Sequence, residues 1–236
     1  MEYYFGLESK SRLQFFGPIH LCLLLGTILI IYLIYKNKEK IKKIKNIDKM
    51  MVFILLSNMI IYSLGGIFLG EFDINFHIPI QYCYITGFIF MYMLLTKKEK
   101  LYNFLYYAII FCTSTVLIFQ DPTVTYDRYH FILMIISHHF LLICNFYVFY
   151  VLNYNVNKKG IKYFCIYSIT LYSIVYVINL ILNTTYIFKD SFPRFMYEYF
   201  PFIDVIPPLA WFAIYSIPLM CFSYFLILKR ENLKIK

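Results

Sequence analysis

Two short motifs carry the groups in this chain that could do covalent chemistry. The motif HIPIQYC (77–83) ends in a cysteine, and ISHHF (136–140) holds two adjacent histidines. A thiol attacks an ester carbonyl as a thiolate, and a neighbouring imidazole can take up its proton. An amide such as that of Asn145 or Asn183 could orient the base or bind the oxyanion. Together these residue types suggest nucleophilic chemistry at a carbonyl group.

These groups lie in or beside stretches that contain no Asp, Glu, Lys or Arg. Each stretch has about 18–25 residues, enough for a helix to cross a hydrocarbon layer of about 30 Å. With 61% hydrophobic and 15% charged residues, the chain could not bury its apolar surface as a soluble domain. The runs do not alternate as barrel strands do, so we expect an all-α polytopic membrane protein, a single domain over 1–236 with seven transmembrane helices. The stretches are 16–35, 50–69, 78–95, 101–120, 130–152, 163–187 and 205–228.

The charges between the stretches are sorted by sign. Of the 22 Lys and Arg, 17 lie in the gaps 36–49, 97–100, 158–162 and 229–236, whereas nine of the 13 acids lie in the other gaps. The positive-inside rule therefore predicts an outside N-terminus and a cytoplasmic C-terminus in the cell membrane. The basic loops then face anionic lipid, so membrane lipids are the expected partners, and the net charge of +9 does not indicate nucleic acid.

The predicted orientation gathers the polar groups in the outer half of the membrane. At 1.5 Å per residue, Cys83 lies about 8 Å below the outer end of its helix and His138 about 12 Å below its own. Polar groups at such depth are costly unless they are paired or used, so we expect an outer pocket. The candidate substrate-binding residues of this pocket are His77, Gln81, Asn145, Asn183 and His20.

Helical angles suggest which side chains share a face. His138 and Asn145 are seven residues apart and face the same way, whereas His139 points about 100° from them. Asn179 and Asn183 share another stripe, which we expect to point inward. The alternative is that these groups make ordinary interhelical hydrogen bonds, each contributing about 1 kcal/mol. The aromatic loop 188–204 is expected in the outer interface, as an aromatic belt or as a lid.

The motif HIPIQYC resembles the proline-containing, Leu-rich motif ending in Cys of the YwaF-type family of bacterial integral-membrane proteins. The motif ISHHF falls where that family carries a membrane histidine, and the loop 188–204 looks like its later pattern. The resemblance covers about residues 75–230. It departs from the family at positions 78 and 80, where Ile replaces Leu.

Eukaryotic relatives of that family are described as acyltransferases that remodel glycerophospholipids through a Cys and a His. The resemblance implies that Cys83 is the nucleophile and His138 its base, with His139 as the other candidate. Acyl chains would enter laterally between helices, and the headgroup would stay at the outer interface near His77 and Gln81. We expect no cofactor.

Two other classes of function fit the sequence. A small-molecule transporter or sensor would also have several spans and an outer polar pocket, although no internal repeat is evident. A metal-dependent hydrolase would draw on zinc-type ligands, but their spacing matches no recognised metal motif, so we expect no metal site. The residues that could supply such ligands are His20, His77, His130, His138, His139 and Cys83.

Overall fold

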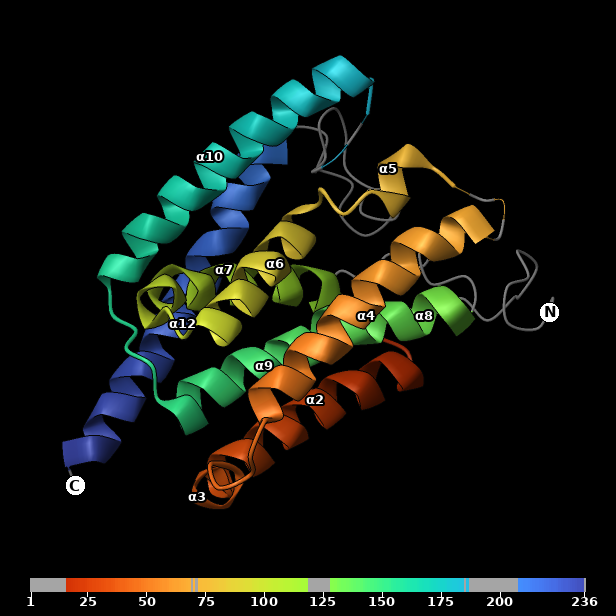
Figure 1. The fold of residues 1–236 in the computed structure, drawn as a ribbon. Coiled ribbons are helices and arrows are strands. Elements are labelled where there is room, and N and C mark those ends of the chain that lie inside the picture. Colours follow the sequence, from red (N-terminus) through yellow and green to blue (C-terminus); the bar gives the residue numbers. More distant parts are fainter. Residues whose placement is uncertain are drawn as a thin grey trace.

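The computed structural model describes residues 16–68, 70, 72–118, 128–184, 186 and 208–235, and within these ranges the chain is helical and has no strand (Figure 1). The α-helices are α2 (Pro18–Lys36), α3 (Lys38–Ile41), α4 (Ile47–Phe68), α5 (Ile74–His77), α6 (Tyr82–Thr96), α7 (Tyr102–Ile118), α8 (Arg128–Met134), α9 (Leu141–Tyr147), α10 (Lys159–Leu182) and α12 (Pro208–Ile235). A 3-10 turn, η1 (Glu99–Leu101), precedes α7. The π-helical segment η2 (Ile135–Phe140) joins α8 to α9, and a second one, η3 (Val148–Leu152), continues α9, so that the four form one long helix.

Each of the seven charge-free stretches coincides with a helix. Five helical segments of the described chain are long and apolar enough to cross a membrane, namely α2, α4, η1–α7, α8–η3 and α10. With 15 residues, α6 reaches only about 22 Å at 1.5 Å per residue, and α12 is not among the five. The all-helical class is therefore confirmed, whereas the number of seven spans and the orientation of the termini stay predictions.

At two of the helix boundaries that differ from those expected, local backbone chemistry explains the difference. Instead of starting at residue 78, α6 begins at Tyr82, because Pro79 lacks an N–H and disfavours helical geometry in the residue before it. The other boundary is the end of α10 at Leu182, because Asn183 adopts a left-handed conformation with φ of 51°. The aromatic loop 188–204 lies outside the described residues.

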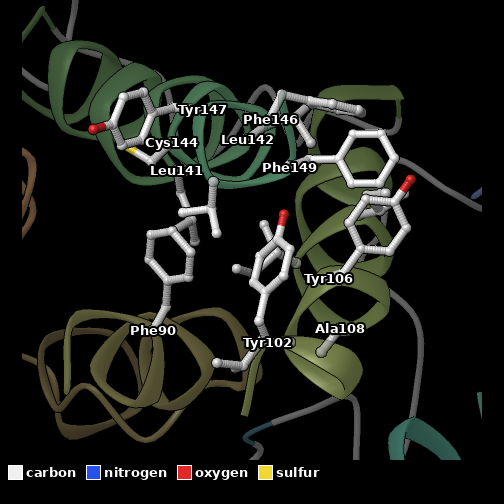
Figure 2. Close-up of a cluster of buried hydrophobic side chains, with 14 of the residues drawn as sticks. Phe90, Tyr102, Tyr106, Ala108, Leu141, Leu142, Cys144, Phe146, Tyr147 and Phe149 are labelled. Carbon is white, nitrogen blue, oxygen red and sulfur yellow. The ribbon is translucent and has the colours of Figure 1, made fainter. Parts of the chain in front are cut away.

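The centre of the bundle is α7, which packs against α6, α9, α10 and α12. Its Tyr102 and Tyr106 are fully buried, and Figure 2 shows them between α7 and the α9–η3 helix. The ring of Tyr106 stacks on Phe149 with 4.9 Å between centroids, while the Tyr102 hydroxyl donates to the Asn145 carbonyl at 2.6 Å. Buried aromatic hydroxyls need such partners, so these bonds fix how α7 and α9 face each other.

A glycine allows α10 to approach α7 closely at one end of the bundle. A Cβ on Gly160 would lie 2.1 Å from the Asn103 carbonyl oxygen. Next to this contact, the Asn103 Oδ1 accepts the N–H of Asn157 at 3.0 Å, and the Tyr107 hydroxyl donates to the Asn157 carbonyl at 3.2 Å. The absence of a side chain at position 160 is thus what lets this hydrogen-bonded contact form.

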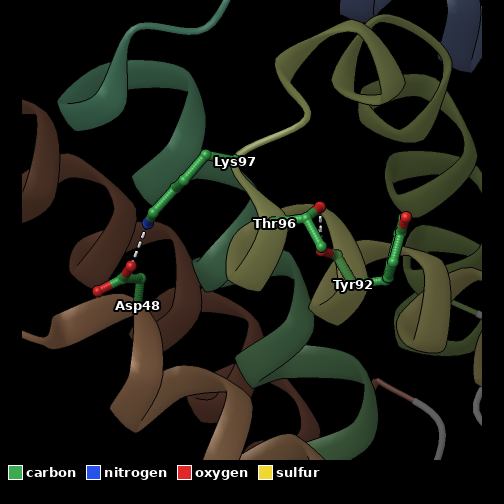
Figure 3. Close-up of polar contacts among 4 residues, drawn as sticks. All are labelled: Asp48, Tyr92, Thr96 and Lys97. Atoms are coloured by element: carbon green, nitrogen blue, oxygen red, sulfur yellow. Dashed lines mark hydrogen bonds and ion pairs between the residues drawn. The ribbon is translucent and has the colours of Figure 1, made fainter.

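Two basic side chains tie segments together beside the basic gaps. Lys97, just after α6, forms an ion pair with Asp48 in the first turn of α4 (Figure 3). Arg230 of α12 donates to the carbonyls of Phe149 at 3.0 Å and Tyr154 at 3.2 Å, and its guanidinium lies 4.1 Å from the Phe149 ring centroid. The last carbonyls of a helix have no partner within it, so Arg230 caps η3 from outside.

Candidate functional site

Cys83 lies in the first turn of α6 and is partly buried. Gln81 is the N-cap residue and is half-buried; its carbonyl accepts the N–H groups of Tyr84 and Ile85. The first N–H groups of a helix have no partner within it and form the positive end of the helix dipole. The break at Pro79 therefore puts the thiol where a helix end favours a negative charge on sulfur.

The Cys83 thiol lies at a junction of three packed elements, α6, α7 and η2. Its Sγ donates to the Cys112 carbonyl oxygen at 3.7 Å. The Cys112 thiol and the His138 imidazole are close enough to this sulfur to interact with it electrostatically. The structure thus brings together Cys83 and His138, two residues that lie far apart in the sequence.

The orientation of the His138 ring is set by its own helix. Its Nδ1 lies 3.2 Å from the Met134 carbonyl oxygen and 2.9 Å from the Ser137 hydroxyl, and that hydroxyl donates to the same carbonyl at 3.2 Å. A carbonyl oxygen can only accept, so this network assigns the proton to Nδ1. Nε2 then carries the lone pair that a general base needs.

His138 and His139 both lie in the π-helical segment η2. Such segments are rare in helices and often occur at functional sites. Because hydrogen bonds in a π turn run from i to i+5, the facing expected from an ideal α-helix does not carry through this region. His138 contacts Cys83 on α6, whereas Asn145 is fully buried against α7 and donates to the Tyr106 carbonyl at 3.4 Å.

His139 points toward a different neighbour from His138. It is 3% exposed, and its Nδ1 lies 2.7 Å from the Thr27 hydroxyl of α2. Of the two histidines that the sequence left open, His138 is the one that interacts electrostatically with the Cys83 thiol. Its role as the base stays a prediction.

His77 is held in a packing role. Its ring stacks between Tyr62 and Phe72, with centroid distances of 5.5 and 5.7 Å, and its Nδ1 accepts the N–H of Asp73 at 3.0 Å. The ring also lies over Gly66, where an added Cβ would be 2.3 Å from it. This close contact explains why a glycine stands at position 66.

His20 links α2 to the end of α7. Its Nδ1 accepts the N–H of Phe16 at 3.0 Å, and its Nε2 lies 2.7 Å from the Leu117 carbonyl oxygen. Both ring nitrogens are thus used, and the residue is fully buried. His20 is placed as an interhelical connection rather than at the thiol.

Asn183 does not face inward as expected, because it is the exposed C-cap residue of α10. The buried amide of this stripe belongs to Asn179. Its Oδ1 accepts from the Thr184 hydroxyl at 2.9 Å and from the Tyr186 N–H at 3.0 Å, and its Nδ2 donates to the Tyr186 carbonyl at 2.8 Å. Asn179 therefore fastens the chain that follows α10.

Three groups at the site were not singled out from the sequence: Ser137, the Met134 carbonyl and Cys112. A serine directly before a histidine is a usable signal, because its hydroxyl can reach both the ring and the preceding helical turn. Cys112 gave no signal, since a lone cysteine in an apolar helix is usually a packing residue.

Among the described residues, no three His, Cys, Asp or Glu side chains gather as a metal-ligand set. His20, His77, His138 and His139 each have separate partners, and the side chain of His130 lies outside the described residues. The site that the structure does assemble is a thiol with an oriented imidazole.

Over residues 4–228 the chain matches the TMEM164 family, and it therefore belongs to this family of membrane proteins. Comparison with curated proteins and with solved structures gave no match. Membership of this family agrees with the helical membrane class.

Proposed function

We propose that this TMEM164-family protein is a membrane-lipid acyltransferase in which Cys83 is the nucleophile and His138 the general base. The observation that carries the proposal is the placement of Cys83 and His138 on α6 and η2, which pack together, with the Nδ1 of His138 held by the Met134 carbonyl and Ser137. The resemblance of the motifs around these residues to a Cys/His acyltransferase family supports the same roles.

In the first half of the reaction, Nε2 of His138 takes the thiol proton and the Cys83 sulfur attacks the ester carbonyl of a donor lipid. The tetrahedral intermediate collapses as the carbon–oxygen ester bond breaks. The leaving alkoxide takes the proton from His138 and departs as a lyso-lipid, and the acyl chain stays on Cys83 as a thioester.

In the second half, the hydroxyl of an acceptor lipid gives its proton to His138 and its oxygen attacks the thioester. The carbon–sulfur bond breaks, and the Cys83 thiolate recovers the proton from His138. The exchange converts one ester and one alcohol into another ester and alcohol, so it needs no oxidant, reductant or cofactor.

Two further features support this chemistry. Cys83 lies in the first turn of α6, and preorganised backbone N–H groups at a helix end are well suited to stabilise the oxyanion of an attacked ester. Both substrates are lipids, which would reach a partly buried thiol from the membrane without crossing water.

The test uses the purified full chain in vesicles that contain a diacyl phospholipid with an isotopically labelled acyl chain and a lysophospholipid with a different headgroup. Mass spectrometry then follows the label into the second lipid. We expect transfer with the wild type, and a loss of about a hundredfold or more with Cys83→Ser or His138→Ala, because a general base contributes at least that factor.

Cys165→Ser is the matched control, since Cys165 is an exposed thiol on α10. It should transfer the label at the wild-type rate. Full transfer by both Cys83→Ser and His138→Ala would overturn the proposal. A carrier would instead move labelled lipid between leaflets without changing its headgroup, and loss of the thiol would leave this movement intact.

A further inference from the structure

A groove of about 350 Å³ lies between α2, α4 and the η2–α9 helix, on the side of η2 where His139 contacts α2. Its rim includes Cys22 and Ile30, which are exposed, so the groove opens onto the outer surface of the bundle. Its described lining is aliphatic or aromatic except for Cys22, Thr27 and His139, and it includes no charged side chain. In a membrane, such a surface is covered by hydrocarbon chains.

One buried polar atom in this lining has no partner. Among the described residues, Nε2 of His139 is a buried nitrogen without a hydrogen bond, and the residue as a whole is only 3% exposed. Burying a polar atom without a hydrogen-bond partner is destabilising, so we expect a ligand to pair with Nε2.

The hydrogen-bond network assigns what kind of ligand this must be. The Thr27 hydroxyl has one hydrogen and donates it to the Leu23 carbonyl at 2.9 Å. Its oxygen can then only accept at the 2.7 Å contact with His139, so the proton of the neutral imidazole is on Nδ1. Nε2 therefore presents a lone pair, and its partner must be a hydrogen-bond donor.

The depth of the site in the membrane and its uncharged lining limit the chemical class of the ligand further. Thr27 is the midpoint of the 19 residues of α2, so from either end the contact lies about 13 Å along the helix, near the middle of a bilayer core of about 30 Å. A phosphate at that depth would lack both water and a cationic partner in the described lining. We propose that the groove binds a neutral lipid with an aliphatic chain and a free hydroxyl, and that the hydroxyl donates to Nε2 of His139.

Nε2 is buried, so the hydroxyl reaches it only when the side chains of the lining rearrange. This binding does not depend on acyl transfer. His139 and Thr27 form the site, while Cys83 is absent from the lining.

The test uses photo-crosslinking to the full chain in lipid nanodiscs, followed by peptide mapping. The probe is a long-chain alcohol with a diazirine on its tail, and the comparison probe is its methyl ether, which lacks the donor hydrogen. We expect the alcohol to label groove peptides about fivefold more than the ether, the factor that a hydrogen bond of about 1 kcal/mol gives. His139→Phe should abolish this preference, because it keeps a ring but removes the acceptor.

A matched pair of variants tests the position of the site. A Cβ at Gly26 would meet no atom within 4 Å, and Gly26 lines the groove, so Gly26→Trp adds a large side chain at its wall. Its neighbour Leu25 is 65% exposed and lies outside the groove, so Leu25→Trp adds the same side chain beside it. Labelling should fall about tenfold with Gly26→Trp, and it should persist with Leu25→Trp and with Cys83→Ser.

Equal labelling of the wild type by the two probes, or stronger labelling by the ether, would overturn the proposed hydroxyl ligand. Unchanged labelling of Gly26→Trp would overturn the site itself. If Cys83→Ser binds the alcohol but no longer transfers acyl chains, the groove and the proposed reaction are separate. Loss of transfer alone therefore leaves this inference standing.

Discussion

The contact between α7 and α10 gives a quantitative prediction for Gly160→Ala. The added Cβ would lie 2.1 Å from the Asn103 carbonyl oxygen, 2.6 Å from its Oδ1 and 2.7 Å from Tyr107 Cε2, whereas ordinary contacts begin at 3.4 Å. The Asn103 and Tyr107 side chains are both held by hydrogen bonds to Asn157, and the Asn103 backbone oxygen cannot rotate away. The helices must therefore separate by about 1 Å, at an overpacking cost of about 1–3 kcal/mol.

For a chain of this size, a loss of about 1 kcal/mol lowers the midpoint of thermal unfolding by about 2–4 °C. We therefore expect Gly160→Ala to unfold about 2–12 °C below the wild type in a thermal melt of the purified protein in detergent. Gly26→Ala is the control, since a Cβ there meets nothing within 4 Å and alanine is the better helix former. A midpoint for Gly160→Ala equal to or above that of Gly26→Ala would refute the reasoning.

Three further predictions concern other contacts. Arg230→Met should lower the melting midpoint, because it removes hydrogen bonds to the Phe149 carbonyl of η3 and to the Tyr154 carbonyl just beyond it, which together contribute about 2–3 kcal/mol. An unchanged midpoint would contradict this cap. Gly66→Ala should also lower it, because the Cβ would lie 2.3 Å from the His77 ring, and His77→Ala in the same chain should restore it. Ser137→Ala should slow lipid transfer about fivefold in the labelled-vesicle assay, since it removes one bond of about 1 kcal/mol to His138, and wild-type transfer would argue against that positioning role.

The sequence predicts the helices well because charge is excluded from lipid for physical reasons. Each charge-free stretch overlaps a helix, and the described breaks between α2 and α4 and between α6 and α7 fall at runs of lysine. The helix ends were predicted less well. Pro79 delays α6, and Asn183 in a left-handed conformation stops α10, so local backbone chemistry moved both boundaries.

The prediction of side-chain facing failed where the helix is not an α-helix. The residue types of η2 do not mark a π turn, so the angles assigned to His138 and Asn145 assumed a geometry that the chain does not have. Ideal helix geometry also predicted that Asn183 faces inward, but Asn183 is exposed and Asn179 is the buried amide.

The pairing of Cys83 with His138 could be proposed only through resemblance. Periodicity describes neighbours along one helix, and these residues lie on different elements whose packing depends on the whole bundle. The groove at His139 could not be predicted from the sequence, since its mostly aliphatic lining comes from α2, α4 and the η2–α9 helix.

The most direct test of the central claim is a search for a thioester on Cys83. The wild-type protein is mixed with vesicles that contain a labelled donor phospholipid and no acceptor, and intact-protein mass spectrometry is performed before and after hydroxylamine treatment. We expect one labelled acyl chain on Cys83 of the wild type, which hydroxylamine removes. In His138→Ala, the labelled chain should appear on Cys83 more slowly. If Cys83 never carries the acyl chain in a protein that does transfer the label once an acceptor lipid is added, the thioester mechanism is wrong.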